Sequence, residues 1–278
     1  MKGTILEKII NTKRERVESA KRLRSIEELR DMAAERRTGV ESHQFLRAVS
    51  SRSRVNVIAE YKRASPSKGS LNDTADPSET AQVYERSGAA AISVLTEEDH
   101  FLGSLANLET VRSAVSIPVL RKDFIFDEYQ IVESAASGAD AVLLIVSMLT
   151  QNELTRLLAC ANEHLLDVIV EVHDERELHI AVSSGAPIIG VNNRDLKSFE
   201  VSLDVSRELI KHAPAGAVMI SESGLRSAAE IRELHQLGYS AFLIGETLMK
   251  SGNLGEELRS LIGVTGPARE PVPGVTAT

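Results

Sequence analysis

Charged and amide side chains follow apolar segments at several points of this sequence. Residues 55–59 read VNVIA, which is typical of a buried strand, and Glu60 and Lys62 come almost directly after them. The same change from apolar to polar occurs at the ends of four further apolar segments. The polar residues at these five ends are Glu60, Lys62, Lys122, Glu171, Asn192 and Glu222.

These polar positions share one face of their expected strands. Successive side chains of a strand point to opposite faces, so Ile58, Glu60 and Lys62 lie on the same side. In the other four segments, an apolar residue or a glycine also stands two positions before the polar one. Lysines beside carboxylates in a partly dry pocket can transfer protons, since burial and neighbouring charges tune their pKa values. A rim of ion pairs that only closes the fold is the alternative, but five strands with the same parity favour a catalytic site.

A repeated unit positions these residues. Polar helical segments end at a glycine, and a short apolar segment follows, as after Gly88, Gly138, Gly185 and Gly238. The apolar segments give eight expected strands between residues 55 and 245, separated by segments with apolar residues at helical spacing. Eight strands that alternate with helices predict an α/β fold, a (β/α)8 TIM barrel. An open doubly wound sheet is the alternative, although no GxGxxG motif follows the first strand.

The two flanking regions differ in pattern. Residues 1–54 read as amphipathic helices, and we expect an N-terminal helical extension packed on the barrel, because about fifty residues alone make a marginal domain. Residues 1–265 are therefore expected to form one domain. The tail, 266–278, lacks a periodic pattern and is predicted to be disordered.

Two later stretches combine a strand end, a glycine and a helix start. They are SESGLRS, residues 221–227, and IGETLM, residues 244–249. Backbone N–H groups at a helix N-terminus bind anions, and the loops after strands seven and eight are the usual phosphate site of this fold. Ser223, Gly224 and Gly245 are the expected contributors. Each motif alone also fits an ordinary turn, but the two together predict a phosphate site.

Composition argues against several classes of function. The 278 residues include 32 Lys and Arg against 40 Asp and Glu, a net charge of −8, which argues against nucleic acid as a partner. The single cysteine, Cys160, allows no intramolecular disulfide, and the histidine spacing indicates no metal site. No apolar run reaches the ~20 residues of a membrane span, and the N-terminus is too charged for a signal peptide. We expect a cytoplasmic, monomeric protein that binds no membrane, with His173 facing solvent in a loop.

Six segments, taken in their order, resemble one enzyme family. They are EYKRASPSKG, LRKDFI, IVEVHDE, GVNNRDL, SESG and FLIGETLM. The ordered set resembles indole-3-glycerol phosphate synthase, the barrel enzyme of tryptophan biosynthesis, and the similarity runs from the N-terminal helices to about residue 263. The resemblance implies a phosphorylated small-molecule substrate, 1-(2-carboxyphenylamino)-1-deoxyribulose 5-phosphate, whose indole ring closes with loss of carbon dioxide and water. It also implies general acid/base catalysis without a metal or organic cofactor.

The resemblance assigns catalytic roles to individual residues. Lys122 is implied to be the general acid that protonates the ketose carbonyl. Glu171 and Lys62 are implied to be the acid and base groups of the later steps, and the sequence leaves open which of them drives dehydration. Glu60 would orient Lys62, and Asn192 would hold a sugar hydroxyl or the developing intermediate. The implied catalytic set is Lys122, Glu171, Lys62, Glu60, Asn192 and Ser223.

The remaining matched positions are implied to bind substrate. Phe101, Phe124 and Leu143 would pack against the anthranilate ring, although Phe124 also fits an ordinary core position. Arg194 and Glu222 would form a supporting network at the rim. The residues implied to hold the phosphate are Ser223, Gly224, Gly245 and Glu246, with Ser65 near them. A carboxylate is unfavourable beside a phosphate but favourable in the first turn of a helix, so the Glu246 side chain is expected to point away while its N–H donates. The family often has a small polar residue at this position, and here the sequence departs from that pattern.

Two other functions remain open from the sequence. Another phosphate-binding barrel, such as a sugar-phosphate isomerase or aldolase, would share the fold, and an aldolase would use a lysine such as Lys122 as a Schiff-base nucleophile. A non-catalytic barrel that binds partners through its N-terminal helices is the other possibility. The cluster of charged residues at the strand ends argues against a non-catalytic barrel, because nothing in such a protein would require it.

Overall fold

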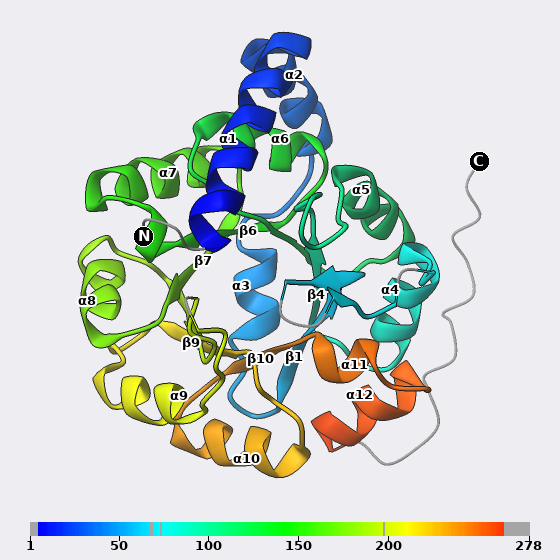
Figure 1. The fold of residues 1–278 in the computed structure, drawn as a ribbon, viewed down its shortest axis with the longest axis vertical. Helices are drawn as coiled ribbons and strands as arrows, with labels where there is room; N and C mark the ends of the chain where they lie inside the picture. The colour runs from blue at the N-terminus through cyan, green and yellow to red at the C-terminus, as the bar shows by residue number, and fades with distance from the viewer. Residues whose placement is uncertain (1–4, 67–68, 73, 197, 264–278) are drawn as a thin grey trace.

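Eight parallel strands close into a barrel at the centre of the molecule (Figure 1). The computed structural model describes residues 5–66, 69–72, 74–196 and 198–263. The strand order is β1–β10–β9–β8–β7–β6–β5–β4, and β4 pairs again with β1, which confirms the predicted (β/α)8 barrel and excludes the open sheet. The barrel strands are β1 (Asn56–Tyr61), β4 (Ala91–Leu95), β5 (Val119–Lys122), β6 (Ala141–Ile145), β7 (Asp167–Val172), β8 (Ile188–Asn192), β9 (Val218–Glu222) and β10 (Ala241–Ile244).

Helices connect the strands and surround the barrel (Figure 1). They are α4 (Pro77–Arg86), α5 (Leu105–Ala114), α6 (Glu128–Ala136), α7 (Gln151–Glu163), α8 (Glu175–Ser183), α9 (Asp204–Leu209), α10 (Ala228–Leu237), α11 (Glu246–Met249) and α12 (Leu254–Ile262), with 3-10 turns η1 (Val146–Met148) and η2 (Ile210–His212). Three of them begin with capping boxes, at Asp127, Thr150 and Ser227, which satisfy free N–H groups of the first turn. The predicted helix-ending glycines are confirmed, since Gly88, Gly138, Gly185 and Gly238 all have positive φ. A hairpin of β2 (Ala64–Ser65) and β3 (Gly69–Ser70) follows β1.

The N-terminal extension is helical, as predicted. It comprises α1 (Ile5–Leu23), α2 (Ile26–Arg36) and α3 (Gln44–Val49). Helix α2 packs against α6 on the outside, whereas α3 contacts β1, β4 and β7 and lies across the barrel in Figure 1. The tail expected to be disordered, 266–278, lies outside the described residues. Among the described helices, none is both long and apolar enough to cross a membrane.

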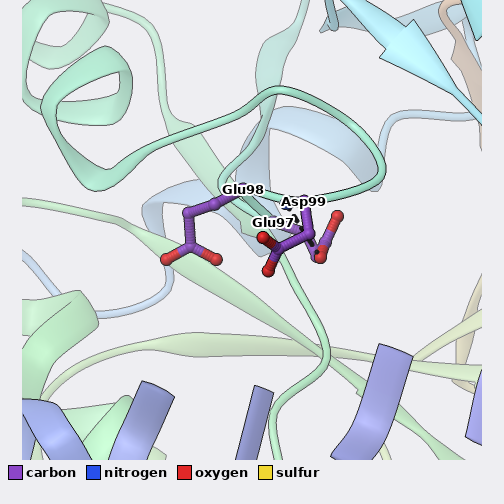
Figure 2. A group of neighbouring side chains, drawn as sticks. All are labelled: Glu97, Glu98 and Asp99. Atoms are coloured by element: carbon purple, nitrogen blue, oxygen red, sulfur yellow. Dashed lines mark hydrogen bonds between the residues drawn. The ribbon is translucent and has the colours of Figure 1, made fainter. Parts of the chain in front are cut away.

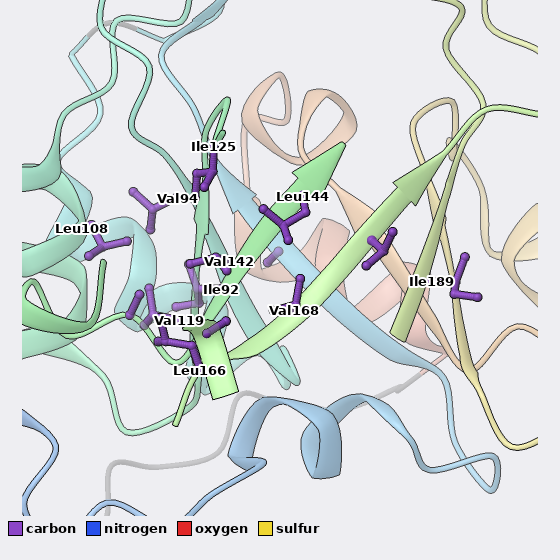
Figure 3. Close-up of a cluster of buried hydrophobic side chains, with 14 of the residues drawn as sticks. Ile92, Val94, Leu108, Val119, Ile125, Val142, Leu144, Leu166, Val168 and Ile189 are labelled. Carbon is purple, nitrogen blue, oxygen red and sulfur yellow. The ribbon is translucent and has the colours of Figure 1, made fainter. Parts of the chain in front are cut away.

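Alternation along the strands divides the buried apolar side chains into two layers. Side chains on one face meet the surrounding helices, as Figure 3 shows for Ile92 and Val119 beside Leu108 of α5. Side chains on the other face, such as Ile58 and Leu120, fill the barrel interior. Because both faces of every strand are covered, the strands read as continuous apolar runs. The predicted parity is confirmed, and the polar residues at the strand ends continue the interior face.

The two ends of the barrel are covered by different helices. At the end where the strands begin, Phe45 and Val49 of α3 are fully buried in the interior layer, and Asp167 of β7 accepts a backbone N–H of α3. At the end where the strands finish, Leu6 and Ile9 of α1 join the interior layer and line a cavity. The first end is therefore a closed floor, and the second carries the candidate site.

Candidate active site

A cavity of about 790 Å³ opens at the carboxyl ends of the strands. Its lining includes every residue predicted from the sequence to be catalytic, namely Lys122, Glu171, Lys62, Glu60, Asn192 and Ser223. It also includes every predicted substrate-binding residue, namely Ser65, Phe101, Phe124, Leu143, Arg194, Glu222, Gly224, Gly245 and Glu246. The structure thus brings the whole predicted set into one place, while the role of each residue remains a prediction.

Lys122 stands between two carboxylates. Its Nζ lies 3.5 Å from Oε2 of Glu171 and 3.6 Å from Oε2 of Glu222, and its side chain is 16% exposed. Burial disfavours the charged ammonium, but the surrounding carboxylates, chiefly Glu171 and Glu222, outweigh this effect and raise the pKa of Lys122. The lysine is therefore protonated before substrate arrives, and it can give its proton only to an oxygen that becomes strongly basic, such as a carbonyl turning into an alkoxide.

The two carboxylates beside Lys122 have opposite pKa shifts. Burial opposes ionisation at Glu171, but Lys122 and His173 outweigh burial and lower the pKa of this carboxyl. At Glu222, burial and the neighbouring carboxylates raise the pKa, although Lys122 opposes them. Among the described residues, no donor forms a hydrogen bond to either carboxylate oxygen of Glu222. One site thus holds a readily ionised base beside a carboxyl that keeps its proton more strongly, a division suited to acid/base catalysis.

Two glycines make room for the buried carboxylates. Glu60 pairs with Lys62 at 2.6 Å, and a Cβ at Gly245 would lie only 2.2 Å from Oε2 of Glu60. A Cβ at Gly190 would lie 2.1 Å from Oε1 of Glu222. Any larger residue at either position would displace a carboxylate from the cavity. The alternation of side chains along the strand identifies Gly190 only as an interior position. It does not show that the Glu222 side chain occupies the space beside it.

The loops after β9 and β10 form one end of the cavity. Ser223 and Gly224 have φ of 67° and 81°, so the chain makes a left-handed turn directly after Glu222. Glu246, the first residue of α11, pairs with Lys250 at 2.7 Å and with Arg194 at 3.5 Å. Lys250 and Arg226 also line this end and were missed from the sequence, since a surface cation on a helix or loop has no distinguishing pattern.

Apolar side chains form the opposite wall. The rings of Phe101 and Phe124 lie 6.2 Å apart at a tilt of 43°, and Leu143 lines the same cavity. Leu6 and Ile9 of α1 complete this wall and were also missed from the sequence. Helical spacing shows that α1 has an apolar face but not which part of the barrel that face covers. The wall gives the cavity a slot suited to a planar aromatic ring.

Three acidic side chains gather in the loop after β4, as Figure 2 shows for Glu97, Glu98 and Asp99. Glu97 is buried and accepts the backbone N–H groups of Asp99, His100 and Phe101. Glu98 pairs with Lys13 at 2.6 Å, and Asp99 pairs with Arg16 at 2.7 Å. These contacts give each carboxylate a partner and fasten the loop that carries Phe101 to α1.

The prediction that His173 faces solvent is wrong. Its side chain is 15% exposed, and Nε2 lies 3.3 Å from Oε1 of Glu171. The residue follows β7 on the same parity as Glu171, which places it near the rim. Its direction is set by Glu177 in the first turn of α8, which accepts both the backbone N–H and Nδ1 of His173. Local sequence alone does not reveal that contact.

The closed parallel barrel, with its charged cavity at the carboxyl ends of the strands, defines the chain as a (β/α)8-barrel enzyme. Residues 6–261 match the family model of indole-3-glycerol phosphate synthase, and the chain belongs to that family.

Relatives with that name are similar over nearly their whole length. The protein from Carboxydothermus hydrogenoformans is 48% identical over 264 residues, which cover 92% of this chain and 99% of the relative. The protein from Bordetella pertussis is 43% identical over 258 residues, which cover 93% and 98%.

Solved structures with the same fold are much less similar in sequence. The 3-hexulose-6-phosphate synthase from Salmonella typhimurium has a TM-score of 0.61 at 15% identity and covers 75% of this chain and 97% of its own. KGPDC from Streptococcus mutans has a TM-score of 0.59 at 14% identity, with coverage of 75% and 95%. At such identities the likeness concerns the fold alone.

Proposed function

We propose that this protein converts 1-(2-carboxyphenylamino)-1-deoxyribulose 5-phosphate into indole-3-glycerol phosphate, a step of tryptophan biosynthesis. The observation that carries the proposal is the position of Lys122, between Glu171 and Glu222 in a cavity with an apolar wall and a glycine-rich end. The substrate has the matching parts: a carbonyl, an aromatic ring and a phosphate.

Ring closure is the step assigned to Lys122. The ring carbon that bears the carboxylate bonds to the ketose carbon, and the carbonyl electron pair moves to the oxygen. Lys122 transfers a proton to this oxygen as its negative charge develops. The nitrogen lone pair completes an iminium, which then accepts the electrons released when the bond to carbon dioxide breaks.

Dehydration is assigned to Lys62 and Glu171. The new hydroxyl leaves as water with a proton from Lys62, which Glu60 holds at 2.6 Å. The carbon between the ring nitrogen and the hydroxyl-bearing carbon loses a proton to Glu171, whose pKa is lowered and which is therefore ionised. The whole reaction consumes one proton: solvent returns protons to Lys122 and Lys62 and takes up the proton that Glu171 accepted. Asn192 lies on the rim beside Glu171 and is assigned to a substrate hydroxyl.

Binding is assigned to the two ends of the cavity. The anthranilate ring would lie against Phe101, Phe124 and Leu143, where burial of an aromatic ring stabilises the complex. The phosphate would lie between two loops: the loop after β9, with Ser223 and Gly224, and the loop after β10, with Gly245 and the first turn of α11. Ser65 would complete this end, and the pair of Glu246 with Lys250 keeps the acidic side chain engaged.

The protein is proposed to act as a monomer in the cytoplasm. Support for a monomer comes from the cavity, because one chain supplies every element that lines it. A cytoplasmic location is supported by the amino-acid biosynthetic function. Sedimentation of the purified protein and fractionation of cells would test the two statements, and a dimer or a membrane-bound fraction would contradict them.

The test of the function is direct, because the chain contains no Trp and only four Tyr. Indole fluorescence should therefore rise above a low protein background when the purified protein is mixed with the carboxyphenylamino-deoxyribulose phosphate. Lys122→Met should lower kcat by about 10²–10⁴, the usual contribution of a general acid. Lys211→Met is the matched control, since Lys211 pairs with Glu208 on the surface, and it should retain wild-type rates.

Other results would change the proposal. No indole signal from folded wild-type protein would overturn the function. A signal that survives Lys122→Met would keep the function and remove the role of Lys122. Trapping of substrate on Lys122 by borohydride would favour the aldolase alternative, which the raised pKa of this lysine disfavours because a Schiff base needs a neutral amine.

A further inference from the structure

His173 is clamped between two carboxylates. Its Nε2 lies 3.3 Å from Oε1 of Glu171, and its Nδ1 lies 3.0 Å from Oε2 of Glu177. Glu177 also accepts the backbone N–H of His173 at 2.9 Å, which fixes both ends of the residue. Glu177 belongs to α8, whereas Glu171 belongs to β7 and lines the cavity. The imidazole therefore joins the helix layer to the proposed base.

The ring is charged in this arrangement. Nδ1 donates to Glu177, whereas Nε2 lies within ion-pair distance of Glu171 without the alignment of a hydrogen bond, so charge is what links the ring to Glu171. Burial opposes the charge, but Glu171 and Glu177 outweigh it and raise the pKa of His173 to about 10. His173 also lines a second cavity of about 470 Å³, together with Arg194, Asp195 and Glu200. At neutral pH the residue is an imidazolium.

Glu171 consequently lies between two cations. Oε1 faces His173 at 3.3 Å, and Oε2 faces Lys122 at 3.5 Å. On the far side of Lys122 stands Glu222, 3.6 Å from Nζ, whose carboxyl keeps its proton more strongly than Glu171 does. If Lys122 gives up its proton during ring closure, it no longer neutralises Glu171. Among the described residues, His173 is then the only cation that still forms an ion pair with Glu171.

We propose that His173 is a positioning residue, whose imidazolium keeps Glu171 oriented and ionised so that Glu171 can accept the substrate proton in the dehydration step. This inference rests on the proposed function. His173 lines the second cavity and not the first, so it is assigned a role that acts through Glu171. Glu177 contributes to the same positioning, because its carboxylate fixes the orientation of the His173 ring.

Kinetics of two variants separate the charge from the hydrogen-bond donor. His173→Gln keeps a donor near Glu171 and loses the charge, whereas His173→Ala loses both. At pH 6 we expect kcat to fall about tenfold in His173→Gln, because without either cation most Glu171 is protonated once Lys122 has given up its proton, and further in His173→Ala. The loss should shrink as the pH rises to 9, because Glu171 ionises again, while KM stays within about twofold of the wild type.

Two further variants serve as checks. Glu177→Gln should shift the pH profile in the same direction but by less, since the His173 ring loses the carboxylate of Glu177 and keeps its contact with Glu171. His179→Ala is the matched control, because His179 lies on α8 and its ring hydrogen-bonds to the backbone carbonyl of Glu175, not to a carboxylate. It should leave the profile unchanged. A loss of kcat in the His173 variants that is equal at every pH, or a profile that coincides with the wild type, would overturn the proposal.

A spectroscopic measurement needs no turnover. The ring nitrogens of His173, followed by nitrogen NMR in the substrate-free protein, should stay doubly protonated at pH 8, and Glu171→Gln should lower the pKa of the ring. A neutral ring at pH 7 would refute the pairing. Absence of indole formation by the wild type would instead refute the proposed function and leave the NMR result intact, so the two failures are distinguishable.

Discussion

The two ends of the barrel differ in how fully their buried carboxylates are paired. At the end where the strands begin, Asp140 pairs with Arg37 at 3.3 Å and with Arg112 at 2.6 Å, and it also accepts the N–H of Val119. At the end where the strands finish, Glu222 shares Lys122 with Glu171 at 3.6 Å and 3.5 Å, and no described residue donates a hydrogen bond to its oxygens.

This difference separates stability from chemistry. Arg37 also donates to the carbonyl groups of Ala139, His164 and Leu165, so the floor of the barrel satisfies its buried polar groups. The end where the strands finish, called the upper end below, leaves carboxylate oxygens without hydrogen-bond donors. This is costly unless a ligand supplies hydroxyl or N–H groups. The floor is therefore expected to determine folding, and the upper end to determine the reaction.

Arg37→Met is expected to give the largest effect on stability. It should lower the free energy of unfolding by about 3 kcal/mol, the low end of the range for a broken buried pair, because Arg112 still neutralises Asp140. Urea unfolding measures the change. The rate per folded molecule should stay at the wild-type value, and a loss of kcat in folded Arg37→Met protein would contradict the division between the ends.

Gly190→Ala tests the upper end with a single methyl group. The new Cβ would meet Oε1 of Glu222 at 2.1 Å, so the carboxylate has to move. A shift of this kind is expected to lower kcat/KM about 10²-fold, because misplacement by about 1 Å costs that much in an ordered site. Gly252→Ala is the control, since its Cβ meets nothing within 4 Å. Equal activity of the two variants would show that Glu222 has no required position.

The sequence predicts those features of the site that depend on local periodicity. Glu60 and Glu171 could be placed on the interior face because strands alternate with period two, and the glycine-ended helices marked where each strand begins. Features that depend on packing could not be predicted. The covering of the cavity by Leu6, the space that Gly190 leaves for Glu222, and the turn of His173 toward Glu171 all require knowledge of which elements meet.

Glu222→Gln and Asp167→Asn should change stability in opposite directions. The pKa of Glu222 is raised in the folded protein, so the folded state holds its proton more strongly and wild-type stability falls as the pH rises above about 4.5. Glu222→Gln removes this fall and should gain about 1 kcal/mol at pH 8, with loss of activity. Asp167→Asn should lose about 1 kcal/mol, because it weakens the contacts of Asp167 with α3 and His43. Thermal unfolding from pH 5 to pH 8 measures both, and the same sign for the two variants would contradict the comparison.

Arg16→Met should have the smallest effect, although Arg16 belongs to a helix that covers the cavity. Its bond to Asp99 joins α1 to the loop that carries Phe101, but the arginine side chain is 45% exposed. Exposed ion pairs contribute about 0–1 kcal/mol, and salt screens them. The buried wall of α1, with Leu6 and Ile9, remains in place and continues to hold the helix on the barrel. Unfolding free energy and KM should therefore stay close to wild type at 0.5 M salt, where the pair is already weakened. A several-fold rise in KM would show instead that the acidic loop, and not the apolar face of α1, sets the position of Phe101.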